Sequence, residues 1–437
     1  MKIIELLNAY IWNFPMLILL LGTHLFFTIR LKFVQKDVFK GIRYSISKDK
    51  SNPDGLSGFA ALATTLAATL GTGNIIGVST AIALGGPGAV LWCWLTGILG
   101  MATTYAECFL SSIYRVKSAS GSYVGGPMYI LEYGLNAKKL AIIYALCTLI
   151  ASFGVGCTTQ SNAISTTGES LWNWSPFIVG FCIAIPVGLV IIGGVQSIGK
   201  VCTKLVPAMG AFYLTGCLIL LVMNHDYILS SIVLIGRSAF QPTAIAGGTI
   251  ASSLQTAARF GIARGLFTNE SGLGTAGIAA ASANTANPKR QALISMTATF
   301  WDTVVMCAIT GLVIVTNLEK NPTSIQNYSN GELTTAAFEA LPYGTTLLGI
   351  AIIAFAVATL IGWSYFGEKA TEYLFGSKGI PLYQLFYIVM IFIGAIMSLN
   401  LVWELTDLIN AFMAIPCLIG ILLLQNKVRV SHTHPSK

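Results

Sequence analysis

The stretch Leu70-Gly71-Thr72-Gly73-Asn74-Ile75 interrupts an apolar run that extends from Gly58 to Leu84. As a helix this run would cover ~40 Å at ~1.5 Å per residue, enough to cross a bilayer core of ~30 Å. Two glycines, a threonine and an asparagine disfavour a helix here, because Gly costs ~1 kcal/mol and Asn and Thr bond to nearby backbone. The stretch therefore predicts a broken membrane helix.

Such a break frees peptide groups, which survive in hydrocarbon only where they face protein, water or a ligand. Bare carbonyls at the end of the first half suit a cation, and bare N–H groups at the start of the second half suit a carboxylate. The alternative is a packing seam of small residues, which explains Ala67, Ala68 and Gly77 but not Asn74.

The composition indicates a polytopic membrane protein. Of 437 residues, 54% are hydrophobic and 10% are charged, whereas soluble domains carry ~25% charged residues. We predict an all-α fold with eleven transmembrane helices, at 10–29, 58–84, 88–114, 140–168, 176–195, 205–223, 243–264, 291–317, 346–366, 382–399 and 406–425. The nine cysteines form no C-x-x-C pair and no nucleotide or hydrolase motif occurs, so we expect neither an enzyme nor a cofactor.

The net charge of +8 comes from Lys and Arg residues that are concentrated in loops on one side of the membrane. With alternate loops on one side, all but three of the 25 Lys and Arg residues share that side, the exceptions being Lys2, Arg237 and Lys320. The positive-inside rule then places the N-terminus outside and the C-terminus in the cytoplasm of a plasma-membrane protein, and no nucleic-acid partner is implied.

The spans divide into one extra helix and two sets of five. Residues 1–50 hold the extra N-terminal helix and a basic loop, 51–225 the first set, and 226–437 the second set with the cytoplasmic tail. An odd number of crossings gives the two sets opposite orientations, as in a 5+5 inverted repeat. We expect a monomer.

The first helix of the second set offers two places for a matching break, around Ser252–Gln255 or at Asn269–Gly274. The second choice would carry Arg259 and Arg264 into the membrane, at a few kcal/mol each. We therefore predict the break near Ser252 and Gln255, although Ser252 has the alternative of bonding back to its own helix.

Few ionisable side chains lie inside the spans. Asp302 falls close to the middle of the eighth span, where a carboxylate is a functional candidate that binds a cation or carries a proton. A hydrogen bond to Thr299 or Thr303 is the structural alternative. We expect Glu107 and Glu368, near the inner ends of their spans, to pair with Lys or Arg.

Two further helices carry candidate binding residues. Thr359 and Trp363 are four residues apart and share a helix face, as do Phe153 and Gln160 at seven. The Thr359 hydroxyl could bind sodium, the Trp363 indole could form a pocket wall, and the Gln160 amide could bind a zwitterion. Ordinary helix packing is the alternative for each. No Lys or Arg reaches mid-membrane, so a substrate carboxylate depends on backbone N–H groups. The residues indicate a site for a small zwitterion with a sodium ion.

The chain resembles the alanine/glycine:cation symporter family in four blocks from about Ser57 to Leu424. The blocks are Gly71-Thr72-Gly73-Asn74-Ile75-Ile76-Gly77 with Ala81–Ala89, Gly125-Gly126-Pro127-Met128, Arg259–Phe267 with Asn269-Glu270, and Gly362–Lys369. The resemblance implies a LeuT-type core of ten helices after one extra helix, and sodium-coupled uptake of alanine or glycine.

The resemblance also implies roles for single residues. Thr72 and Gly73 would face the substrate carboxylate and Trp363 the substrate, and Thr69, Asn74 and Asp302 would serve a first sodium site. A second sodium site would use Ala67, Leu70 and Thr359. The chain departs from the family pattern at Cys157, Thr158, Ser271 and Ala358. Ala358 leaves the second sodium site one hydroxyl poorer.

We therefore expect a secondary active transporter that couples sodium to a small neutral amino acid by alternating access. Two alternatives stay open at this point: proton coupling through Asp302, and a passive channel or facilitator.

Overall fold

The run from Gly58 onward is broken as predicted. In the computed structural model, α4 (Gly58–Thr69) and α5 (Ile76–Gly85) are separated by a short 3-10 turn, η2 (Thr72–Asn74), and the chain bends by 62° between them. The Ser57 hydroxyl caps α4 by accepting the N–H of Ala60 at 3.0 Å. The Gly71 N–H bonds to the Thr69 carbonyl at 2.9 Å, so it does not continue the helix to Ala67.

The structure describes residues 7–8, 10–12, 14–47, 56–118, 121–240, 254–322, 331–397 and 400–429. Among these residues, six helices are long and apolar enough to cross a membrane, or up to eight if each bent pair is one span. The further helices are α2 (Phe14–Arg30), α3 (Val38–Ile46), α6 (Ala89–Ile113), α7 (Pro127–Tyr129), α8 (Lys138–Phe153), α9 (Thr159–Trp172), α10 (Pro176–Ile192), α11 (Gly194–Met223), α12 (Ile228–Ser238), α13 (Leu254–Asn269), α14 (Thr275–Ala281), α15 (Pro288–Thr299), α16 (Ala308–Lys320), α18 (Leu333–Phe338), α19 (Gly344–Phe375), α20 (Ile380–Ile396) and α21 (Asn400–Leu423). One two-stranded antiparallel ribbon, β1 (Val116–Lys117) with β2 (Tyr123–Val124), accompanies them.

Two long membrane spans contain a π-helical segment. η4 (Gly154–Thr158) joins α8 to α9, and η6 (Phe300–Cys307) joins α15 to α16. π-helical turns are rare and often occur at functional sites. Here they carry or adjoin Gln160 and Asp302, two of the predicted site residues.

A helix break in the second half of the chain lies at Asn269–Gly274, the second of the two places considered. α13 begins at Leu254, the first residue described after Phe240, and the chain leaves the helix after Asn269, to begin α14 at Thr275. Glu270, Gly272 and Gly274 all have positive φ, of 52°, 91° and 89°. Every residue of α14 is buried, so this helix belongs to the bundle.

The two broken helices lie beside one another. Leu56, just before α4, pairs with the chain just after α14: its N–H donates to the Ser282 carbonyl at 3.1 Å, and its carbonyl accepts the Asn284 N–H at 2.7 Å. α5 packs on α13, where a Cβ atom added at Gly85 would lie 3.2 Å from Cβ of Phe260. The two half-helix pairs thus run in opposite directions.

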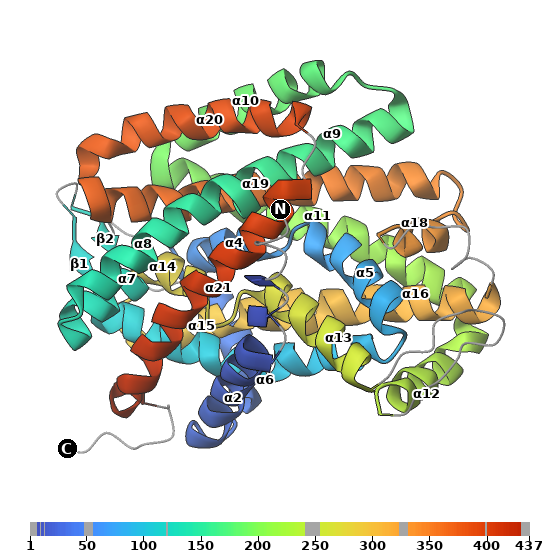
Figure 1. Cartoon of the computed structure of the whole chain (residues 1–437), viewed down its shortest axis with the longest axis horizontal. Helices are drawn as coiled ribbons and strands as arrows, with labels where there is room; N and C mark the ends of the chain where they lie inside the picture. Colours follow the sequence, from blue (N-terminus) through green and yellow to red (C-terminus); the bar gives the residue numbers. More distant parts are fainter. Residues whose placement is uncertain are drawn as a thin grey trace.

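The other helices surround this pair (Figure 1). α19 crosses α4 closely, since a Cβ atom added at Gly362 would lie 2.6 Å from the Ala68 nitrogen. α10 and α20 lie side by side at one edge of the bundle, and α2 packs on α6 at the opposite edge (Figure 1). The interrupted backbone is therefore enclosed by helices, as unpaired peptide groups require.

Candidate functional site

The side chain of Asn74 connects the first break to η6. Its amide oxygen accepts the Gly71 N–H at 3.0 Å, and its Nδ2 donates to Oδ1 of Asp302 at 2.7 Å and to the Asp302 carbonyl at 3.2 Å. Oδ2 of Asp302 accepts the Thr303 hydroxyl at 2.6 Å. Both Asn74 and Asp302 are fully buried. The predicted first sodium site thus contains a carboxylate that two neutral donors hold in place.

The end of α4 supplies oxygen atoms beside this pair. The hydroxyl of Thr69 is buried and has no hydrogen-bond partner among the described residues. On the other side of the break, a Cβ atom added at Gly71 would lie 2.8 Å from Oγ1 of Thr359. Thr359 therefore lies within reach of the end of α4, where Ala67 belongs to the last turn and Leu70 is the residue after the helix. A buried oxygen without a partner is costly unless a ligand occupies the site.

Gln160 contacts the break from α9. Its Oε1 accepts the Thr72 hydroxyl at 3.3 Å, and its Nε2 donates to the Val155 carbonyl at 3.2 Å. This carbonyl lies in η4, where the π-helical turn changes the bonding of the backbone. The same turn alters the rotation per residue, so Phe153 and Gln160 do not follow the spacing of an ordinary helix. Phe153 packs against Tyr383 and Tyr387 of α20, with ring centroids 5.5 and 6.0 Å apart.

Trp363 lies between η4 and the second break. A Cβ atom added at Gly156 would lie 2.1 Å from Cβ of Trp363, so only glycine leaves room for α19 here. The indole Nε1 donates to Oε1 of Glu270 at 3.1 Å, and the side chain is fully buried. Trp363 therefore joins the helix that carries Thr359 to the turn between α13 and α14.

Glu270 is a functional candidate that the sequence reasoning missed. Its Oε2 accepts the Thr275 hydroxyl at 2.6 Å, and its side chain is 4% exposed. The two breaks also meet directly, because a Cβ atom added at Gly73 would lie 2.8 Å from Cγ2 of Thr268. The signal was present in Asn269–Gly274, where an asparagine and two glycines repeat the composition of the first break and stand beside Glu270.

The structure shows a break at Asn269–Gly274, and the position predicted near Ser252 and Gln255 is described only from Leu254 onward. Ser252 lies outside the described residues, and Gln255 is an exposed residue of α13 in a groove shared with α2. The argument failed because it assumed that both arginines would face lipid. The Arg264 guanidinium lies 6.0 Å from the Phe267 ring centroid, and its stem packs near Gly77 of α5. Contact with protein removes most of the assumed cost.

The two remaining intramembrane acids behave differently. Glu368 pairs with Lys369 at 3.4 Å, as predicted. Glu107 does not pair with a basic residue: its Oε2 accepts the Gly272 N–H at 3.1 Å, and its Oε1 has no partner among the described residues. The reason is position, because α6 directs Glu107 at the second break and not at the basic surface.

Three buried carboxyl groups therefore surround the two breaks: Asp302, Glu270 and Glu107. The ion pairs of the described residues include none of them. A buried carboxylate is stable only with a compensating charge or several donors. The site can therefore accept a small cation, and the backbone of η2 can donate to an anionic group.

Comparison with known proteins agrees with this chemistry. The model of the family described as "Sodium:alanine symporter family" matches residues 1–434. The Sodium/alanine symporter AgcS of Methanococcus maripaludis is 45% identical over 441 residues, covering 99% of this chain and 96% of the relative. An uncharacterized transporter of Haemophilus influenzae is 42% identical over 438 residues, covering 99% and 95%.

A solved structure of a Na+-coupled sialic acid symporter, in a substrate-bound outward-open state, has the same fold. It aligns with a TM-score of 0.60 at 13% identity, covering 93% of this chain and 86% of the symporter. At this identity the likeness shows the fold alone, which is the LeuT-type fold.

The family model matches nearly the whole chain, and a sodium/alanine symporter is 45% identical to it. The chain therefore belongs to the sodium:alanine symporter family and is a multi-pass membrane transporter, not an enzyme.

Proposed function

We propose that this protein is a secondary active transporter that couples the entry of sodium to the uptake of a small neutral amino acid, alanine or glycine. The observation that carries the proposal is the meeting of two helix breaks, where Gly73 contacts Thr268 and Asn74 bonds to Asp302. Such breaks at a midplane site are typical of transporters with inverted repeats.

The amino-acid substrate would bind at the first break. The N–H groups at Thr72, Gly73 and the start of α5 would receive its carboxylate. Gln160 would hold Thr72 in place. Trp363, fixed by Glu270, would form a wall that leaves room for a small side chain only.

We propose two sodium sites beside the first break. The first would use Thr69, Asn74 and the Asp302 carboxylate, and the unpartnered hydroxyl of Thr69 supports it. The second would use the carbonyls of Ala67 and Leu70 with the Thr359 hydroxyl. Oxygen ligands of this kind suit a hard cation.

The energetics permit accumulation. A sodium ion that crosses a potential of 100 mV gains ~2.3 kcal/mol, which concentrates a neutral substrate roughly 40-fold. Alternating access would then move one half of the molecule against the other around the breaks.

We propose the topology on the same basis. The protein would have eleven transmembrane helices, one extra helix in 1–50 and a 5+5 inverted repeat in 51–225 and 226–437. The N-terminus would be outside and the C-terminus in the cytoplasm of the plasma membrane, and the working unit would be a monomer. Opposite chain directions in α4–α5 and α13–α14 support the repeat.

Uptake by proteoliposomes tests the proposal. With an inward sodium gradient and labelled alanine, we expect transient accumulation above the external concentration, and none when sodium is equal on both sides. Equilibration without accumulation under every gradient would identify a passive facilitator. Accumulation that follows a proton gradient in the absence of sodium would identify proton coupling through Asp302.

A further inference from the structure

A long apolar groove lies at the edge of the bundle, away from the breaks. It has a volume of about 790 Å³ and is lined by residues of α9, α10, α11 and α19. The α10 residues on its wall extend from Ile178 to Val190, or ~18 Å of helix at ~1.5 Å per residue, and the turn at Asn173–Ser175 lengthens the wall. This length covers more than half of the ~30 Å of a bilayer core, so the groove is shaped for an extended molecule.

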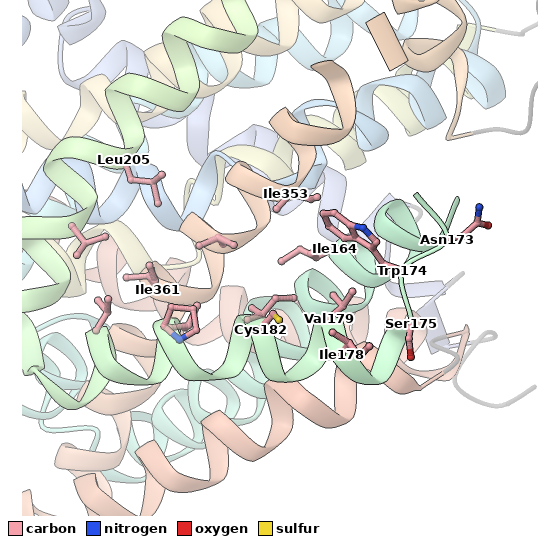
Figure 2. A pocket seen from close by; sticks show the side chains of 16 residues that line it. Ile164, Asn173, Trp174, Ser175, Ile178, Val179, Cys182, Leu205, Ile353 and Ile361 are labelled. Atoms are coloured by element: carbon pink, nitrogen blue, oxygen red, sulfur yellow. The ribbon is translucent and has the colours of Figure 1, made fainter. Parts of the chain in front are cut away.

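Polar atoms gather at one end of the groove. Asn173, Trp174 and Ser175, in the turn between α9 and α10, lie together there, whereas Leu205 and Ile361 lie toward the other end (Figure 2). The rings of Trp172 and Trp174 stack at 4.6 Å. Tryptophans are enriched where the membrane meets water, so this end suits a lipid headgroup. None of the residues that line the groove in the described part of the chain is charged.

The outer face of α10 connects the groove to lipid. Ile178, which lines the groove, is 61% exposed, and Ile185 and Leu189, which follow it on the same side of α10, are 61% and 69% exposed. A chain from the bilayer can therefore enter beside α10 without crossing a polar surface. A water-filled groove of this composition would be unfavourable, because apolar surface costs ~25 cal/mol per Å² in water.

We propose that this groove binds one acyl chain of a membrane phospholipid, with the headgroup at Asn173, Trp174 and Ser175. The chain would lie between α10 and α19, in contact with Ile353, Val357 and Ile361 of α19. These residues are roughly 200° around the helix from Thr359 and Trp363. The bound lipid thus supports α19 on the face opposite to the candidate site.

Photo-crosslinking tests the proposal. The purified protein is reconstituted with a small fraction of phosphatidylcholine that carries a diazirine on one acyl chain, and adducts are mapped by mass spectrometry. We expect adducts on Val357 or Ile361 as well as on α10. Val357 lines the groove from α19 and is half-buried, so lipid that stays on the outer face of α10 does not reach it.

Two matched tryptophan variants of α10 complete the test. Cys182 lines the groove and Ile185 does not, so Cys182→Trp fills the groove while Ile185→Trp adds the same ring to the outer face. We expect Cys182→Trp to reduce α19 adducts at least tenfold and Ile185→Trp to leave them unchanged. If Cys182→Trp does not fold, Ile353→Trp fills the groove from α19.

Adducts confined to the outer face of α10 in the native protein would overturn the proposal. Equal α19 adducts in the filled and unfilled variants would overturn it too. Neither result depends on transport, so the groove and the transport proposal are tested separately.

Discussion

Asn74 donates to Asp302 across 2.7 Å, and this bond joins a break in one half of the chain to a π-helical segment in the other. The same side chain accepts the Gly71 N–H. One amide therefore satisfies the interrupted backbone and orients the carboxylate that is proposed to bind sodium. Loss of the amide should affect both.

Asn74→Ala tests this relationship. The substitution leaves the Gly71 N–H without its side-chain acceptor and removes one donor from Asp302, at ~1–3 kcal/mol for each unsatisfied group. We expect the sodium concentration for half-maximal alanine uptake to rise roughly 10- to 100-fold. Asn162→Ala is the control, because Asn162 is half-buried and its amide donates to the Met397 carbonyl at 2.8 Å. Equal effects of the two substitutions would contradict the assignment.

Asp302→Asn separates sodium coupling from proton coupling. The amide has nearly the shape of the carboxylate but no charge, so a sodium ion loses its anionic ligand. We expect at least a tenfold weaker sodium dependence of uptake, at every pH tested. The exposed Asp226→Asn is the control. If the native protein instead takes up alanine without sodium in a pH-dependent way, and Asp302→Asn abolishes that dependence, the transporter couples to protons through Asp302.

The contact between Trp363 and Glu270 is suited to a double-mutant cycle. Trp363→Phe keeps an aromatic wall but removes the N–H, and Glu270→Gln removes the charge of its acceptor. We expect alanine binding to weaken in each variant, with a coupling energy of ~0.5–3 kcal/mol in the double variant. Trp94→Phe is the control, since Trp94 is exposed and donates to the Val304 carbonyl. Strict additivity would show that the two side chains act independently.

The first break could be predicted from the sequence because its signal is local. Two glycines, Thr72 and Asn74 conflict with a helix whatever surrounds them. The spans were also placed within a few residues for most helices, for example 88–114 for α6 (Ala89–Ile113). Apolar length and charge determine such spans, and both can be read from one sequence.

The second break and the carboxylates around it depend on tertiary contacts. The choice against Asn269–Gly274 rested on the cost of Arg264 in lipid, but the fold gives Arg264 a protein surface. The π-helical turn η4 could not be predicted from the sequence either, because Gly156 in this turn packs closely against Trp363 of α19. The partners of Glu107 and Glu270 come from helices far away in the chain.

Gly156 provides a test of packing around Trp363. A Cβ atom added there would lie 2.1 Å from Cβ of Trp363, so Gly156→Ala must displace α19 from η4. Forced overpacking costs ~1–3 kcal/mol, and we expect a lower midpoint of thermal unfolding in detergent. Gly210→Ala in α11 is the control: nothing lies within 4 Å of its added Cβ, and alanine favours the helix by ~0.5–1 kcal/mol. A Gly156→Ala variant as stable as the control would contradict the close contact.

The central claim is that the first break binds an ion and a substrate together. The most direct test is the affinity of the purified native protein for labelled alanine, measured in sodium and in an equal concentration of choline. We predict that sodium tightens alanine binding at least tenfold, or ~1.4 kcal/mol, and that alanine tightens sodium binding by the same factor. The same alanine affinity in both salts would contradict the account.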